Sequence, residues 1–97
     1  MSELERVVAV LKEHKGKLRV DFGVKEIGIF GSVVRGELKE DSDIDILVEF
    51  EKPIGLLRFI ELEDFLSRLI GRKVDLVSKK ALKPYIGKHI LKEVLII

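Results

Sequence analysis

The chain has 97 residues, which is the length of one domain, and its 46% apolar content suffices for a single core without disulfide or metal staples. Lys and Arg number 18 against 17 Asp and Glu, and a net charge of only +1 argues against non-specific coating of nucleic acid. The absence of cysteine excludes disulfides, thiolate metal sites and a cysteine nucleophile, and we expect an intracellular, cytoplasmic protein.

The start of the chain predicts an amphipathic helix. Ser2 and Glu5 have the spacing of a capping box, and apolar residues recur at helical intervals as far as Gly23. Gly16 lies inside this pattern and costs about 1 kcal/mol relative to alanine, which predicts a kink or an early end near His14-Lys15-Gly16. The acidic start predicts no presequence, and no apolar run reaches the ~18 residues that span a bilayer.

The remaining residues alternate strands and helices. Apolar and polar periodicity, with Gly and Pro as punctuation, predicts the boundaries of each element. The expected elements are a strand over 24–30, one helical turn within 31–36, a polar loop over 37–42, a mostly buried strand over 43–50, a helix over 54–70, a strand over 74–77, a helix over 81–93 and a last strand over 94–97. We therefore expect one compact α/β (α+β) domain over residues 1–97.

The carboxylates of Asp43 and Asp45 are the most unusual feature of the predicted strands. The two-residue period of a strand projects both side chains from one face, among apolar neighbours. Burying two like charges costs several kcal/mol unless a cation compensates, and oxygen ligands favour Mg²⁺ or Mn²⁺. Asp75 supplies a third carboxylate from a nearby predicted strand. Three carboxylates with two divalent ions are typical of phosphoryl or nucleotidyl transfer.

A candidate phosphate site precedes these carboxylates. Gly31 and Ser32 lie at the predicted strand-to-helix turn, where a residue without Cβ lets backbone N–H groups approach an anion. The Ser32 hydroxyl adds a donor, and Arg35 follows three residues later on the same face of the turn. A guanidinium there can bind phosphate oxygens in a bidentate manner.

Each feature taken alone has an ordinary explanation. A Gly-Ser pair is most often a simple turn, Ser42-Asp43 is also typical of a loop cap, and Asp75 alone could be a surface charge. It is much harder to obtain the whole order by accident. That order is a strand, a Gly-Ser pair, a short helix, a strand with Asp-x-Asp and a later strand with one Asp. It is this order that favours a functional interpretation.

The combined order resembles that of the minimal nucleotidyltransferases of the DNA polymerase β superfamily. Their signature is a Gly-Ser pair followed, after about ten residues, by Asp-x-Asp, and here residues 33–42 separate Ser32 from Asp43. The resemblance runs from the first helix to residue 97, with its specific part in Gly31–Val48. It implies a mixed sheet of three to four strands flanked by helices, and transfer of a nucleoside monophosphate to a hydroxyl with release of pyrophosphate.

The resemblance also implies a partner and a role for each site residue. Many such domains are similar to antitoxins that add AMP to a tyrosine of a helical HEPN-domain toxin. By this resemblance Asp43 and Asp45 hold two Mg²⁺ ions (or Mn²⁺), while Asp75 binds one of them and helps to deprotonate the acceptor. Residues Gly31, Ser32 and Arg35 hold the triphosphate of ATP or another nucleoside triphosphate.

Two other functions stay open at this point. A binding module would neutralise its toxin by contact alone, but it has no physical need for three converging carboxylates. A transferase for a small molecule would need further segments to enclose its acceptor.

The helix over 54–70 and the C-terminal part give further expectations. The helix has more apolar residues than one sheet can bury, so its surplus face should meet a partner protein or a second copy of the chain. His14 and His89 are expected to be exposed or at helix ends, the C-terminal lysines to be solvated, and Tyr85 to pack on the sheet rather than stack on a base. Abundant Lys and Glu without Asn, Gln or Thr is typical of thermophilic proteins.

Overall fold

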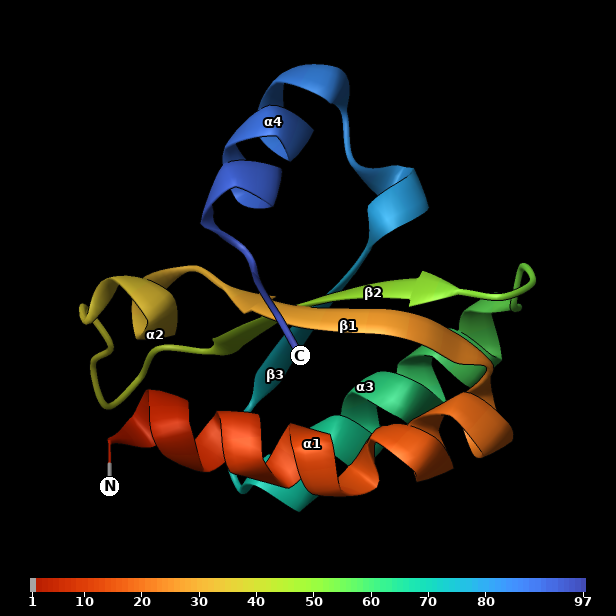
Figure 1. The fold of residues 1–97 in the computed structure, drawn as a ribbon, viewed down its shortest axis with the longest axis horizontal. Helices are drawn as coiled ribbons and strands as arrows, with labels where there is room; N and C mark the ends of the chain where they lie inside the picture. The colour runs from red at the N-terminus through yellow and green to blue at the C-terminus, as the bar shows by residue number, and fades with distance from the viewer. Residues whose placement is uncertain (1) are drawn as a thin grey trace.

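A four-stranded mixed sheet forms the centre of the structure, a computed structural model that describes residues 2–97 (Figure 1). The strand order is β3-β2-β1-β4; β1 is antiparallel to both of its neighbours and β2 is parallel to β3. The elements in chain order are α1 (Glu3–Phe22), β1 (Val24–Phe30), α2 (Ser32–Arg35), β2 (Ile44–Phe50), α3 (Leu56–Ile70), β3 (Val74–Ser78), the 3₁₀ turn η1 (Lys79–Ala81), α4 (Pro84–Glu93) and β4 (Leu95–Ile96). The expected α/β class and mixed sheet are confirmed.

Helix α1 begins as predicted but does not end early. The Ser2 hydroxyl accepts a hydrogen bond from the Glu5 backbone N–H, and the Glu5 side chain accepts one from the Ser2 backbone, which completes the capping box. The helix then continues through Gly16 to a left-handed cap at Gly23. The early end was wrong because Leu18, one turn further on, is fully buried, and that burial outweighs the cost of one glycine.

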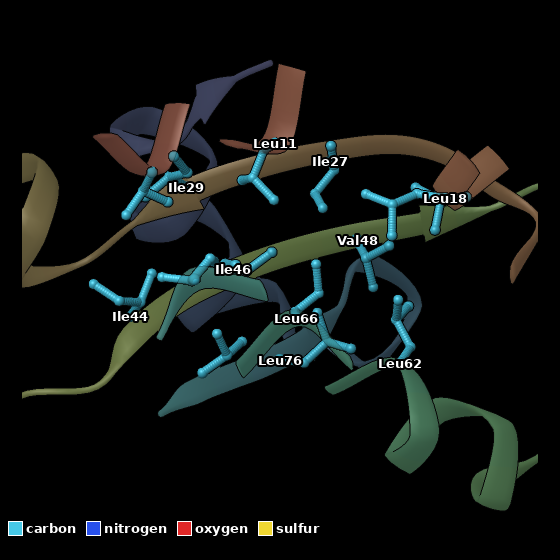
Figure 2. Packing of buried hydrophobic residues seen from close by; sticks show 14 of the residues in the cluster. Leu11, Leu18, Ile27, Ile29, Ile44, Ile46, Val48, Leu62, Leu66 and Leu76 are labelled. Atoms are coloured by element: carbon cyan, nitrogen blue, oxygen red, sulfur yellow. The ribbon is translucent and has the colours of Figure 1, made fainter. Parts of the chain in front are cut away.

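One face of the sheet packs against α1 and α3 to form the core (Figure 2). On β2 the alternate residues Ile44, Ile46 and Val48 are fully buried on this face. The two helices bring their own fully buried residues to the same layer; the largest are Leu11, Leu18, Leu62, Leu66 and Ile70. This dry layer fixes the backbone of β2 and therefore the direction of the side chains on its other face.

The other face of the sheet is covered in part by α4 and the turn η1 (Figure 1). Helix α4 begins at Pro84 rather than at residue 81, since Pro84 occupies the first turn and residues 79–81 form η1 instead. The chain then returns as β4 beside Gly28, where an added Cβ would lie 2.6 Å from a Val94 methyl carbon. Within residues 2–97, no helix has both the length and the apolar content to cross a membrane.

Candidate active site

A groove of about 490 Å³ lies between the sheet and α4, and it contains several of the predicted site residues. The sheet and the following turn contribute Phe30, Gly31, Arg35 and Asp45 to its lining, and α4 contributes Tyr85, Ile86, His89, Ile90 and Glu93. Its volume lies within the range of about 300 to 1,000 Å³ typical of small-molecule sites. The groove is therefore the candidate site for a nucleotide.

Asp45 lies on the groove side of β2 because its neighbours Ile44 and Ile46 point into the core. In the sheet register Asp45 is paired with Phe30 of β1 and with Asp75 of β3, which places Asp45 and Asp75 side by side on adjacent strands. Burial, followed by the charges of Asp75 and Asp43, raises the pKa of Asp45 to about 6. The charges of the three carboxylates thus interact, and a cation beside Asp45 would stabilise its ionised form.

The donor set fits Mg²⁺ only when a further oxygen donor is present. Asp75 is exposed and Asp43 is half-buried, with a carboxylate oxygen 3.9 Å from Lys73 Nζ. In the part of the chain that the structure describes, no three His, Cys, Asp or Glu side chains are gathered closely enough to hold a metal ion. Mg²⁺ in phosphoryl-transfer sites commonly uses one or two carboxylates together with substrate phosphates and water. The aspartates suit such shared coordination.

Gly31 has two separate reasons to be glycine. Its backbone has φ of +81° and ψ of −154°, a conformation that other residues rarely adopt. A Cβ at this position would also overlap the carboxylate of Asp45. The missing side chain therefore allows the Asp45 carboxylate to lie directly against the turn that precedes α2, where Ser32 begins the helix.

The Gly31 N–H and the Arg35 guanidinium meet at one anion, the carboxylate of Glu93. Gly31 N donates to Glu93 Oε2 at 2.9 Å, and an Arg35 terminal nitrogen donates to Oε1 at 2.6 Å. Arg35 Nε lies 3.3 Å from the exposed carboxylate of Glu37. The hydrogen bond from Arg35 is the main cause that lowers the pKa of Glu93 below its ordinary value. The structure thus brings Gly31, Arg35 and Asp45 together in the groove, whereas Ser32, Asp43 and Asp75 are not among its lining residues.

Sequence reasoning missed Glu93. A carboxylate in the last turn of a helix is unfavourable beside the negative end of the helix dipole, so its position at the end of α4 was the available signal that it has a cationic partner.

Sequence reasoning also missed Arg72, which holds the loop before Asp43. Its guanidinium donates to the carbonyl oxygens of Lys39 at 2.8 Å and Ser42 at 2.9 Å, and it also reaches Glu3 of α1. The loop over 37–43 connects α2 to the strand that carries Asp45. Arg72 therefore positions Asp43 through the backbone before it.

Tyr85 and the two histidines are the remaining residues with an expected position. Tyr85 is 79% exposed, which contradicts packing against the sheet, and its ring contacts that of His89 at 5.2 Å between centroids. The reason is that the groove, rather than close packing, separates the α4 residues from Tyr85 to Glu93 from the sheet. His89 is exposed as expected. His14 is half-buried in the middle of α1, where Nδ1 is 2.8 Å from the Val10 carbonyl oxygen, so its expected exposure or helix-end position was wrong because α1 continues past Gly16.

Comparison with known proteins shows the family of this chain. The family model described as the nucleotidyltransferase domain matches residues 11–97. The chain belongs to the nucleotidyltransferase domain family. This nucleotidyltransferase is 57% identical, over 94 residues, to the protein adenylyltransferase MntA of Thermococcus cleftensis, and the match covers 97% of this chain and 95% of that protein.

Solved structures show the same fold. A structure assigned to the minimal nucleotidyltransferases has a TM-score of 0.76 and 38% identity, with 98% of this chain and 95% of that chain covered. A complex of a tri-AMPylated Shewanella oneidensis HEPN toxin with an MNT antitoxin contains a chain with a TM-score of 0.68. That chain is 18% identical, with 97% of this nucleotidyltransferase and 70% of that chain covered, and the likeness is one of fold alone.

Proposed function

We propose that this nucleotidyltransferase is a Mg²⁺-dependent protein adenylyltransferase. It moves AMP from ATP to a tyrosine hydroxyl of a HEPN-domain toxin and thereby acts as the antitoxin. The observation that carries the proposal is the meeting of the Asp45 carboxylate, the Gly31 N–H and the Arg35 guanidinium in one groove. The T. cleftensis relative supports adenylyl transfer to a protein, and the S. oneidensis complex supports a HEPN toxin as the acceptor.

The phosphate-binding role falls to Gly31, Ser32 and Arg35. The Gly31 N–H and the Arg35 guanidinium already bind an anionic side chain, so their donors are directed at one place. The Ser32 hydroxyl, on the next residue, is a further donor to the triphosphate. The guanidinium fork of Arg35 matches the oxygens of a phosphate. It stabilises the transition state most strongly because negative charge develops there on the leaving pyrophosphate.

The metal-binding role falls to the three aspartates. Asp43 and Asp45 would hold two Mg²⁺ ions, or Mn²⁺, and Asp75 would bind one of them. Such ions neutralise phosphate charge and lower the pKa of an attacking hydroxyl. The raised pKa of Asp45 supports this role, because its ionised form at neutral pH needs a nearby positive charge.

In the transfer step the acceptor oxygen bonds to the α-phosphorus of ATP, and the bond from that phosphorus to the oxygen bridging it to the β-phosphate breaks. Pyrophosphate leaves with the electron pair of that bond. The proton of the acceptor hydroxyl passes to Asp75, which is exposed on the strand beside Asp45, and then to water. An exposed base suits an acceptor that another protein brings to the site.

The start of α3 supports a protein partner. Leu56 is 73% and Leu57 is 78% exposed, and Ile60 is also exposed, which confirms that the apolar residues of this helix exceed what the sheet buries. An apolar hollow of about 360 Å³ adjoins them, lined in part by Phe50 and Ile54. We propose that the toxin docks here, in an interface that buries at least ~1,000 Å². A stable dimer of the isolated chain that buries these residues would overturn this docking site.

The decisive experiment uses the nucleotidyltransferase, Mg²⁺ and a candidate HEPN toxin. ATP labelled at the α-phosphate should label the toxin, whereas ATP labelled at the γ-phosphate should not, and mass spectrometry should place AMP on a tyrosine. Asp43→Asn should remove the labelling and also the neutralisation of the toxin. If the toxin is neutralised without any label, and equally well by Asp43→Asn, the protein is a non-catalytic binding module.

A further inference from the structure

The Glu93 carboxylate lies where the proposed function requires a phosphate. Its two oxygens accept from the Gly31 N–H at 2.9 Å and from the Arg35 guanidinium at 2.6 Å. These are the donors that the proposed function assigns to the triphosphate. Because a carboxylate and a phosphate present similar anionic oxygens to such donors, both cannot occupy the pair at once.

We infer that the Glu93 side chain occupies the phosphate site when no nucleotide is bound, and that the polyphosphate of the nucleotide displaces it on binding. The inference rests on the proposed function, since it takes Gly31 and Arg35 as the triphosphate donors. It adds a determinant of nucleotide affinity that lies outside the Gly-Ser and Asp-x-Asp segments. Glu93 belongs to the far end of the chain and reaches the turn only through the fold.

The charges around Glu93 favour this exchange. With the metal absent, Glu93 and Asp45 are both anions beside one guanidinium, and the charge of Glu93 contributes to the raised pKa of Asp45. An incoming nucleotide with its bound Mg²⁺ would take over the Arg35 contact. Glu93, whose side chain is 24% exposed, lies close enough to solvent to turn away without burying an unpaired charge.

Displacement of Glu93 also affects α4. Within residues 2–97, Glu93 makes the only side-chain hydrogen bonds that join α4 to the rest of the chain. The apolar side chains of α4 add little packing, since Tyr85, Ile86 and Leu91 are all about half exposed or more. Figure 1 shows the helix standing above the sheet on two connecting segments. Binding of a polyphosphate should therefore loosen α4, the wall of the groove that faces Asp45.

The test compares Glu93→Gln with the matched control Glu37→Gln. Both variants remove a carboxylate that contacts Arg35, but Glu37 does not contact Gly31 and is far more exposed. Calorimetric titration with Mg²⁺-tripolyphosphate and with a non-hydrolysable ATP analogue gives the affinity of each protein. Glu93→Gln should bind both ligands about five-fold more tightly than wild type, on the scale of one charge-assisted contact, and Glu37→Gln should change little.

Two further measurements separate competition from a merely structural role. In an Arg35→Ala background the gain from Glu93→Gln should shrink, because the shared donor is gone. Amide hydrogen exchange over residues 84–93 should become faster when wild type binds tripolyphosphate, and should already be fast in Glu93→Gln. Unchanged or weaker binding by folded Glu93→Gln would overturn the inference while toxin labelling by wild type leaves the proposed function intact. Failure of wild type to bind either ligand would overturn both.

Discussion

The two faces of the sheet differ although the same strands build both. On β2 the residues Ile44, Ile46 and Val48 are buried under α1 and α3, while Asp45 lines the groove on the other face. The first face is dry and close-packed, whereas the second has like charges under a single loosely attached helix. The packed face therefore stabilises the strand in a position that the charged face alone would oppose.

The same contrast separates stability from chemistry. Substitutions on the face that packs against α1 and α3 should lower the free energy of unfolding. The fraction of the variant that remains folded should keep the chemistry of the groove. Substitution of the aspartates on the face toward α4 should change transfer and leave the fold unchanged or slightly more stable. Neighbouring residues of β2 allow this contrast to be tested one position apart.

The largest effect is expected from Asp45→Asn or Asp43→Asn. Each should lower the rate of transfer by at least about a thousandfold, because loss of a metal-binding carboxylate removes several kcal/mol of transition-state stabilisation. The melting temperature should hold or rise, since each change relieves repulsion among the aspartates. Labelled-AMP transfer and thermal unfolding measure the two effects.

The matched control for that experiment is Asp64→Asn. Asp64 is an exposed carboxylate on α3 whose partner, Arg68, lies one helical turn away. The Asp64→Asn variant should retain the wild-type rate of AMP transfer. Near-wild-type transfer by Asp45→Asn would remove the two-metal assignment.

The next largest effect is expected on the packed face, from Ile46→Ala. Ile46 is fully buried beside Asp45, and truncating a buried isoleucine costs about 3 kcal/mol through lost burial and a residual cavity. Urea unfolding should show this loss, while Val20→Ala, at a position 82% exposed, should stay within about 0.5 kcal/mol of wild type. A cost below about 1 kcal/mol for Ile46→Ala would show that the face is not close-packed.

Local patterns were enough to predict the packed face and the opposite orientation of Asp45. The alternation along β2 separates Ile46 from Asp45 without tertiary information, and the capping box places the start of α1. Gly31 was recognised from the turn, although its second reason, the approach of the Asp45 carboxylate, depends on the pairing of β1 with β2.

Contacts between distant segments could not be predicted in this way. Glu93 meets Gly31 across 62 positions, and Arg72 meets Ser42 across 30, so no sequence period links either pair. The continuation of α1 past Gly16 likewise depends on what covers Leu18. The packing of Tyr85 was predicted wrongly because the position of α4 depends on contacts such as that between Glu93 and Arg35. The apolar pattern of the helix does not reveal such contacts.

A smaller effect on the charged face is expected from Arg35→Lys. It should raise the KM for ATP about tenfold and lower turnover, because a point charge cannot replace a bidentate fork on the triphosphate. Arg35→Ala should be worse in both parameters. Steady-state kinetics that leave both KM and turnover unchanged would exclude Arg35 from the site.

The smallest effect, and the most specific to the charged face, is the pH dependence that Asp45 gives to stability without metal. Its pKa is raised from 3.8 to about 6 in the folded chain, so between these values the folded state keeps a proton that the unfolded state releases. The contribution of Asp45 to stability is therefore fully present below pH 3.8 and is lost as pH rises through about 6.

Comparison with Asp45→Asn isolates this contribution from every other titrating group. In EDTA at pH 8, Asp45→Asn should be more stable than wild type by about 1 kcal/mol, a value reduced for the screening of a half-buried group by water. The difference should vanish near pH 4. Mg²⁺ added together with a non-hydrolysable ATP analogue should stabilise wild type at pH 8 more than Asp45→Asn, since the variant lacks one of the carboxylates that would share the ion with the phosphates. A stability difference that is the same at pH 4 and pH 8 would show that solvent, rather than the protein, sets the charge of Asp45.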